Sequence, residues 1–243
     1  MISKQQSKFV KSLKLKKYRK NAASFLVEGA KNVQEVLTAN YKIRHLFVTN
    51  KFLDEYPQFS GLDYNLCTEK ELISIGTFQS NEYALAVASM KDQVLEMPNV
   101  RFAIALDDVS DPGNLGTIIR IADWYGIDTI LASKETADFY NPKVISASMG
   151  SFTRVTMHYV DLSRFLSLNT THRIYGAMLQ GNNIYKTKFS FPSILLMGNE
   201  SNGISPSLIN FVDEQVTIPK IGGAESLNVA VSTAIMCDNI FRP

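Results

Sequence analysis

Residues 102–120 read FAIALDDVSDPGNLGTIIR and predict how the larger part of this chain folds. The first five residues are apolar without a break, as in strands buried on both faces, so we expect a strand over Phe102–Asp107. Pro112 and Gly113 favour a turn, and Asn114 is a residue type that often caps a helix. The stretch is therefore a strand, a polar loop and a helix, which is the unit from which parallel sheets are built.

This strand, loop and helix pattern repeats from Arg101 to the end of the chain. Such repetition predicts an α/β domain with a mostly parallel sheet covered by helices. We expect its six strands at Phe102–Asp107, Ile127–Leu131, Arg154–His158, Arg173–Met178, Ile194–Gly198 and Glu214–Pro219.

Two later loops are as polar and glycine-bearing as the first. The second covers residues 198–206, where Ser205 followed by Pro206 predicts the start of a helix. The third covers residues 218–228 and precedes an apolar helix expected over Val229–Ile240. Ligands of parallel α/β sheets bind outside the carboxyl ends of the strands, where such loops gather. We therefore expect the three loops to form one site that holds a nucleoside-like ligand through backbone groups.

The sequence lacks the familiar signatures of other enzyme classes. It has no GxGxxG after the first strand, no GxxxxGK(S/T) and no GxSxG. Cys67 and Cys237 stand far apart and the three histidines are scattered, which excludes a local metal motif or Ser/His/Asp triad. We expect packed, reduced thiols and no metal. Because no apolar run reaches membrane-span length and the amino terminus is polar, we expect a cytoplasmic protein.

The amino-terminal region has a different character. Residues 1–20 contain eight Lys or Arg and no Asp or Glu, whereas the whole chain has a net charge of only +2. This basic arm is either an electrostatic footprint for a polyphosphate or a flexible, solvated tail. A small α/β unit follows, and a polar linker over Lys91–Pro98 ends it. We place the domains at residues 1–95 and 96–243.

The three loops together resemble the signature motifs of the SpoU family of RNA ribose 2'-O-methyltransferases, in the SPOUT superfamily. The order and the spacing both match. The matching residues are Asp111-Pro112-Gly113-Asn114-Leu115-Gly116 with Ile119-Arg120, Met197-Gly198-Asn199-Glu200 with Gly203-Ile204-Ser205, and Ile218-Pro219 with Glu225-Ser226-Leu227-Asn228-Val229. More loosely, Phe25-Leu26-Val27-Glu28-Gly29 resembles the family's L30e-like substrate-binding domain.

The resemblance implies a trefoil-knotted catalytic domain, S-adenosylmethionine as cofactor, rRNA or tRNA as substrate, and a homodimer whose interface includes the last helix. General rules alone predict an unknotted sheet. By resemblance, the cofactor-binding residues are Met197, Gly198, Gly203, Ile218 and Leu227. The catalytic residues implied in the same way are Asn114, Arg120, Glu200, Ser226 and Asn228.

The reaction implied is methyl transfer to a ribose 2'-hydroxyl, which must be aligned and must lose its proton. The family assigns help with that proton to Arg120. Because a guanidinium holds its own proton strongly, we favour positioning and charge stabilisation as the role of this residue. Two other readings stay open: a non-enzymatic RNA-binding dimer, and a SPOUT enzyme that methylates a base nitrogen. The sequence departs from the family pattern at Ser201-Asn202 and at Gly222-Gly223-Ala224, which we expect to alter loop shape or RNA contacts.

Overall fold

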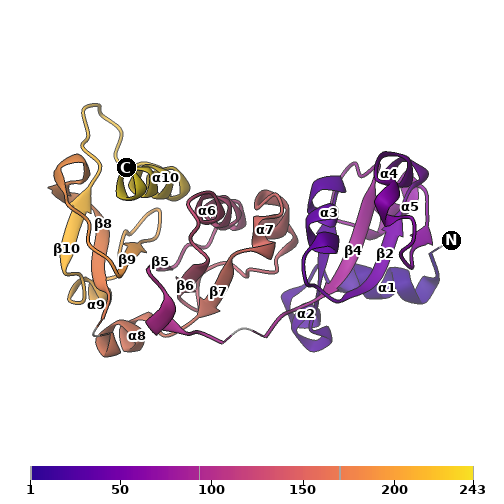
Figure 1. The fold of residues 1–243 in the computed structure, drawn as a ribbon, viewed down its shortest axis with the longest axis horizontal. Coiled ribbons are helices and arrows are strands. Elements are labelled where there is room, and N and C mark those ends of the chain that lie inside the picture. Colours follow the sequence, from indigo (N-terminus) through magenta and orange to yellow (C-terminus); the bar gives the residue numbers. More distant parts are fainter. Residues whose placement is uncertain (1, 93, 170, 243) are drawn as a thin grey trace. The chain divides into compact units, whose positions relative to one another are not determined.

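The computed structural model describes residues 2–92, 94–169 and 171–242 and divides the chain into two compact units (Figure 1). Unit 1 contains Met1–Asp92 with Asp138–Thr153, and unit 2 contains Gln93–Ala137 with Arg154–Pro243. The chain therefore leaves unit 2 after Ala137 and returns to it at Arg154. Each unit has its own sheet.

Unit 2 is built on a six-stranded sheet in which every neighbouring pair is parallel. The strand order is β10-β8-β9-β5-β6-β7. The strands are β5 (Phe102–Leu106), β6 (Thr129–Ala132), β7 (Thr156–Tyr159), β8 (Arg173–Asn183), β9 (Ser193–Met197) and β10 (Glu214–Thr217). All six strands expected from the sequence are present with shifted ends, and the α/β fold with a parallel sheet is confirmed.

Helices cover both faces of this sheet, as Figure 1 shows. They are α6 (Pro112–Trp124), α8 (Leu162–Leu168), α9 (Pro206–Ile209) and α10 (Val229–Phe241). Ala103 and Ala105 of β5 pack in one cluster with Leu162 of α8, while the Phe102 ring lies 5.1 Å from the Phe241 ring of α10. Successive side chains of a strand point to opposite faces, so β5 needs an apolar residue at every position.

Strands β5 and β9 end side by side. Their register pairs Leu106 with Met197, and the Asp107 N–H donates to the Met197 carbonyl at 2.9 Å. The segments that follow these two strands therefore leave the sheet at the same edge. This places the first and second polar loops together, as the sequence predicts.

Unit 1 contains a four-stranded sheet of order β1-β4-β2-β3. Strand β4 pairs antiparallel with β1 and β2, and β2 pairs parallel with β3. The strands are β1 (Ser24–Glu28), β2 (Ile43–Val48), β3 (Asn65–Leu66) and β4 (Ala84–Ser89). The helices are α1 (Lys4–Ser12), α2 (Lys16–Ala22), α3 (Ala30–Thr38), α4 (Asn50–Glu55), α5 (Glu69–Ile75) and α7 (Pro142–Ala147). Within the described residues, no helix of either unit has the length and apolar character of a membrane span.

Residues 138–153 connect β6 to β7 in the chain but pack on unit 1. Helix α7 contacts β1, and the Phe25 ring of β1 lies 4.5 Å from the Tyr140 ring and 5.9 Å from the Phe152 ring. Aromatic pairs at such separations stabilise the fold by more than the apolar area that they bury accounts for. Residues 138–153 are held on unit 1 by ring contacts between residues that are far apart in the sequence. Local sequence patterns therefore do not indicate this packing.

The basic arm forms helices α1 and α2, so its interpretation as a flexible tail is wrong. Val10 and Leu13 are buried in the core of unit 1. Arg19 is also buried: its guanidinium donates to the carbonyls of Leu13 and Lys14 and to a carboxylate oxygen of Asp138, the last at 2.5 Å. Arg19 therefore belongs to the interior. The lysines of the arm all stay exposed: Lys4, Lys8, Lys11, Lys14, Lys16, Lys17 and Lys20.

Both cysteines are buried free thiols. Burial raises the pKa of Cys67 and of Cys237 to about 12. The thiols therefore stay protonated near neutral pH and are poor nucleophiles.

Candidate active site

The first and second loops are joined by a buried carboxylate. Asp107, the residue after β5, is 6% exposed, and its Oδ2 accepts the Ser205 N–H at 2.7 Å. Ser205 is the N-cap residue of α9 and Pro206 follows it at the first helical position, as the sequence predicts. A carboxylate that accepts a backbone N–H is a strong, charge-assisted acceptor, so Asp107 fixes where the second loop ends.

The second loop closes on itself at Gly198. The backbone of Asn199 exchanges two hydrogen bonds with that of Gly203, at 3.0 and 2.9 Å. A Cβ at Gly198 would lie 2.1 Å from the Gly203 carbonyl carbon and 2.3 Å from the Ile204 nitrogen. Gly203 has a φ of 68°, which a residue with a side chain rarely adopts. Both glycines are therefore required by the shape of the loop.

Asn199 fixes this loop from inside. Its Oδ1 accepts the N–H groups of Ser201 and Asn202, and its Nδ2 donates to the Asp108 carbonyl at 2.9 Å. Asp108 itself has a φ of 55°. Our sequence reasoning gave no role to Asp107, Asp108 or Asn199. Their residue types could have indicated these roles, because Asp and Asn tolerate a positive φ and form hydrogen bonds with nearby backbone groups.

Asn114 does not cap helix α6, contrary to the sequence-based expectation. The N-cap is Asp111, whose carboxylate accepts the Asn114 N–H at 2.8 Å, with Pro112 at the first helical position. The Asn114 side chain is thereby left for other partners. Its Nδ2 donates to Glu200 Oε1 at 2.7 Å, and its Oδ1 accepts from Asn228 Nδ2 at 2.9 Å.

This amide joins all three loops. Asn114 comes from the first loop, Glu200 from the second and Asn228 from the third. Asn228 also caps helix α10, because its Oδ1 accepts the N–H groups of Ala230 and Val231. In this network the side-chain amides of Asn114 and Asn228 each accept through oxygen and donate through nitrogen. The hydrogen bonds therefore fix the orientation of both amides.

Arg120 and Ser226 lie outside this network. Arg120 sits on an exposed position of α6, six residues beyond Asn114 and thus about 9 Å along the helix axis. Among the described residues, neither side chain has a recorded hydrogen bond or ion pair. The structure thus brings together Asn114, Glu200 and Asn228 and leaves the Arg120 guanidinium open to solvent.

The residues expected to bind the cofactor follow the ends of β9 and β10. Met197 is buried at the end of β9, whereas Leu227 is 47% exposed in the third loop. Ile218 is half-buried directly after β10. Among the described residues, the backbone N–H groups of residues 220–227 donate no hydrogen bond to another backbone group, and Pro219 has no N–H. The third loop therefore offers backbone N–H donors together with apolar side chains, and a site for a nucleoside uses both.

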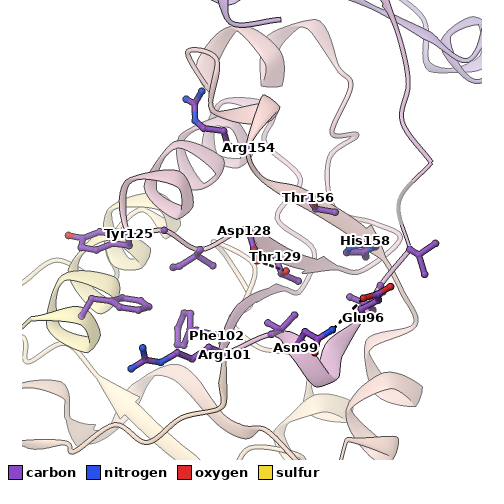
Figure 2. A pocket seen from close by; sticks show the side chains of 16 residues that line it. Glu96, Asn99, Arg101, Phe102, Tyr125, Asp128, Thr129, Arg154, Thr156 and His158 are labelled. Carbon is purple, nitrogen blue, oxygen red and sulfur yellow. Dashed lines mark hydrogen bonds between the residues drawn. The ribbon is translucent and has the colours of Figure 1, made fainter. Parts of the chain in front are cut away.

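A cavity of about 730 Å³ lies at the amino-terminal ends of β5, β6 and β7, whereas the three loops follow the carboxyl ends of their strands (Figure 2). Phe102, Thr129 and Thr156, the first residues of β5, β6 and β7, line it, as does His158. Burial lowers the pKa of His158, so this histidine is neutral at pH 7. Arg154, labelled in Figure 2, is held by a bidentate contact with Asp123. None of the ten expected site residues lines this cavity, and we give it no catalytic role.

Comparison with known families agrees with the two-part organisation. The sequence profile of the SpoU rRNA Methylase family matches residues 101–238. The profile of the MRM3-like substrate binding domain matches residues 4–86.

Individual relatives extend over nearly the whole chain. The 23S rRNA (guanosine(2553)-2'-O)-methyltransferase RlmP of Bacillus subtilis is 29% identical over 96% of this chain and 94% of its own length. A putative RNA methyltransferase of the TrmH family from Porphyromonas gingivalis is 34% identical, with a TM-score of 0.86, and the match covers 100% of this chain and 99% of that one. An AdoMet-bound rRNA methyltransferase from Sinorhizobium meliloti is 29% identical, with a TM-score of 0.87, and covers 100% and 97%.

Proposed function

This chain belongs to the SpoU rRNA methylase family, and from that membership we propose that it transfers a methyl group from S-adenosylmethionine to a ribose 2'-hydroxyl of ribosomal RNA. The observation that carries the proposal is the Asn114 amide, which ties the three family motifs into one site. The choice of ribosomal RNA over tRNA is supported by relatives whose names specify 23S rRNA.

The residues at the ends of β9 and β10 fit S-adenosylmethionine. Backbone groups of Gly198, Ile218 and Leu227 would hold its polar edges, and Met197 and Gly203 would lie beside them. This assignment is supported by the closed, side-chain-free backbone at Gly198 and by the free N–H groups of the third loop. When bound, the cofactor would supply a methyl group on a sulfonium sulfur, which passes to the hydroxyl oxygen as the carbon–sulfur bond breaks and a neutral thioether leaves; such a displacement needs no metal.

The hydrogen-bonded network and Arg120 have separate tasks. Asn114, held between Glu200 and Asn228, keeps the first turn of α6 fixed against the other loops. Arg120 would bind the ribose or its phosphate and stabilise negative charge that develops on the attacking oxygen as its proton leaves to solvent. Ser226 would donate to the ribose from the third loop. Alignment of oxygen and methyl carbon can supply roughly 7 to 11 kcal/mol of such a barrier.

Transfer of labelled methyl groups tests this proposal. The purified chain is incubated with labelled S-adenosylmethionine and unmodified ribosomal RNA or tRNA, with and without EDTA, and the product is digested for nucleoside mass spectrometry. We expect label in ribosomal RNA, as a 2'-O-methylnucleoside, whether or not EDTA is present. A base-methylated product would contradict the reaction, and RNA binding without transfer would support a non-enzymatic role instead.

We also propose that the chain acts as a homodimer through helices α6 and α10. The support is the exposed apolar surface that these helices and the adjoining loop carry: Trp124 is 83% exposed, Val231 49% and Leu227 47%. Isolated exposed apolar residues are common, but these lie at both ends of two packed helices, with Val231 close to Asn228 at the start of α10 and Trp124 at the end of α6. Light scattering on the eluting protein should give twice the 27.2 kDa of one chain. A mass of one chain at micromolar concentration would contradict the dimer.

Two expectations from the resemblance stay proposals. The first is the trefoil knot, which family membership supports; a crystal structure whose carboxyl-terminal chain threads no loop would contradict it. The second is a cytoplasmic location, which is where a protein that modifies ribosomal RNA meets its substrate. Recovery of the chain with washed membranes would contradict the second.

A further inference from the structure

The three loops of unit 2 contain four asparagines, and three of their side-chain amides are engaged within the protein. Asn114 bonds Glu200 and Asn228, and Asn228 also caps α10. Asn199 bonds backbone groups of the first and second loops. The fourth is Asn202, whose side chain is exposed. Among the described residues, its backbone N–H has a recorded partner and its side-chain amide has none.

The two common structural roles of an asparagine in a turn are both filled by other residues of the second loop. Asparagine is favoured where φ is positive, but in this turn the positive φ belongs to Gly203. Asparagine side chains also bond backbone groups two or three residues further on. Here Asn199 does so, because its Oδ1 accepts the N–H groups of Ser201 and Asn202 at 2.9 and 3.2 Å. The turn therefore does not require the Asn202 amide.

The same turn holds Asn202 in a defined place next to the proposed catalytic residues. On either side of the turn, the backbone of Asn199 exchanges two hydrogen bonds with that of Gly203. Within the turn, Glu200 Oε1 accepts from Asn114 Nδ2 at 2.7 Å, which fixes the turn to the first loop. Asn202 thus lies two residues from a member of the hydrogen-bonded network.

The chemistry of the proposed substrate requires the base of the target nucleotide to lie close to these loops. The base is attached to C1' of the ribose, and the reacting hydroxyl is on the neighbouring carbon, C2'. The Watson–Crick edge of each base presents a hydrogen-bond donor beside an acceptor. A side-chain amide presents the complementary pair. By contrast, the hydroxyl of Ser201 has donor and acceptor on one atom, Lys220 only donates and Glu225 only accepts.

We infer that Asn202 binds the Watson–Crick edge of the target base and so helps to select which nucleotide is methylated. The inference rests on the proposed function, because it assumes that a ribose accepts the methyl group. Asn202 is also a position at which the sequence departs from the family pattern. Since a base edge bonded to protein is not paired with another base, the target nucleotide is unpaired in the complex. The fixed backbone of residue 202 makes the amide approach the base from one direction, and one base then fits better than the others.

The test uses the full-length chain and transcripts of the ribosomal RNA segment that it methylates, with each of the four bases at the target position. Rates with labelled S-adenosylmethionine give kcat/KM for each transcript, and nucleoside mass spectrometry shows whether the label is on ribose. Wild type should prefer one base. Asn202→Ala should lower kcat/KM for that base by roughly 5- to 150-fold and bring the four transcripts close together. Asn202→Asp keeps the shape but loses the donor, so a similar loss is expected.

Asn210→Ala is the matched control, because it removes an exposed asparagine at the end of α9, outside the three loops. It should change neither the rates nor the base preference. Circular dichroism melting and calorimetric titration with S-adenosylmethionine should show that both Asn202 variants fold and bind cofactor like wild type.

The outcomes separate this inference from the proposed function. Ribose methylation with the same base preference in Asn202→Ala as in wild type would overturn the inference alone, as would equal wild-type rates on the four transcripts. Loss of base preference in Glu225→Gln but not in Asn202→Ala would also overturn it and assign base recognition to the third loop. If wild type methylates no ribose, the proposed function fails and the inference fails with it.

Discussion

Arg120→Ala is expected to lower kcat for ribose methylation by roughly 100- to 1,000-fold. The substitution removes a guanidinium that, among the described residues, has no structural partner, so it should leave the fold and the affinity for S-adenosylmethionine unchanged. Loss of charge stabilisation at the attacking oxygen acts on the transition state, which is why kcat should fall. Single-turnover kinetics and calorimetric titration with S-adenosylmethionine measure the two quantities separately.

Matched variants make this result specific to the position. Arg120→Lys keeps a positive charge but loses the planar fork that binds phosphate or ribose at two points, so we expect a partial loss. Arg164→Ala removes an exposed arginine from α8, on the opposite face of the sheet, and should leave kcat unchanged. An Arg120→Ala enzyme with wild-type kcat would remove Arg120 from the site.

Gly198→Ala should weaken S-adenosylmethionine binding by at least about 100-fold and destabilise unit 2 by about 1 to 3 kcal/mol. The new Cβ would lie 2.1 and 2.3 Å from backbone atoms of residues 203 and 204, which cannot rotate away as a side chain could. To relieve this clash, the two backbone hydrogen bonds between Asn199 and Gly203 have to break. These hydrogen bonds close the loop that we expect to hold the cofactor. Titration calorimetry and thermal melting report the two effects.

Gly61→Ala is the matched control for the added methyl group. A Cβ at Gly61 would meet nothing within 4 Å, so the variant should melt and bind cofactor like wild type. If Gly198→Ala melts normally but loses cofactor, the loop shape alone explains the loss. Normal cofactor affinity in Gly198→Ala would contradict the placement of the site at this loop.

The sequence allowed the sheet of unit 2 to be predicted because its strands are unbroken apolar runs followed by polar, glycine-bearing loops. Residues Phe102 to Leu106 need apolar side chains on both faces, and such a run leaves little choice of structure. The observed strand ends differ from the predicted ones by a few residues, most of all in β8, where residues 179–182 are exposed and do not follow an apolar pattern.

The contacts that fix the site could not be predicted in the same way. Asn114 has the residue type of a cap, and only the presence of Asp111 as the actual cap frees its amide for Glu200 and Asn228. Both partners are more than 80 residues away in the chain. The burial of Arg19 likewise depends on Asp138, 119 residues away. Local pattern identifies residue types for a site, whereas pairings across such distances depend on the folded backbone.

Mapping of ribose methylation in ribosomal RNA tests the central claim most directly. Ribosomal RNA from a strain without this chain is compared with RNA from the same strain complemented by wild type or by Arg120→Ala. The account predicts that one 2'-O-methyl group is lost, returns with wild type and stays absent or nearly so with Arg120→Ala. A full set of ribose methyl groups in the deletion strain, or the loss of a base methyl group instead, would contradict it.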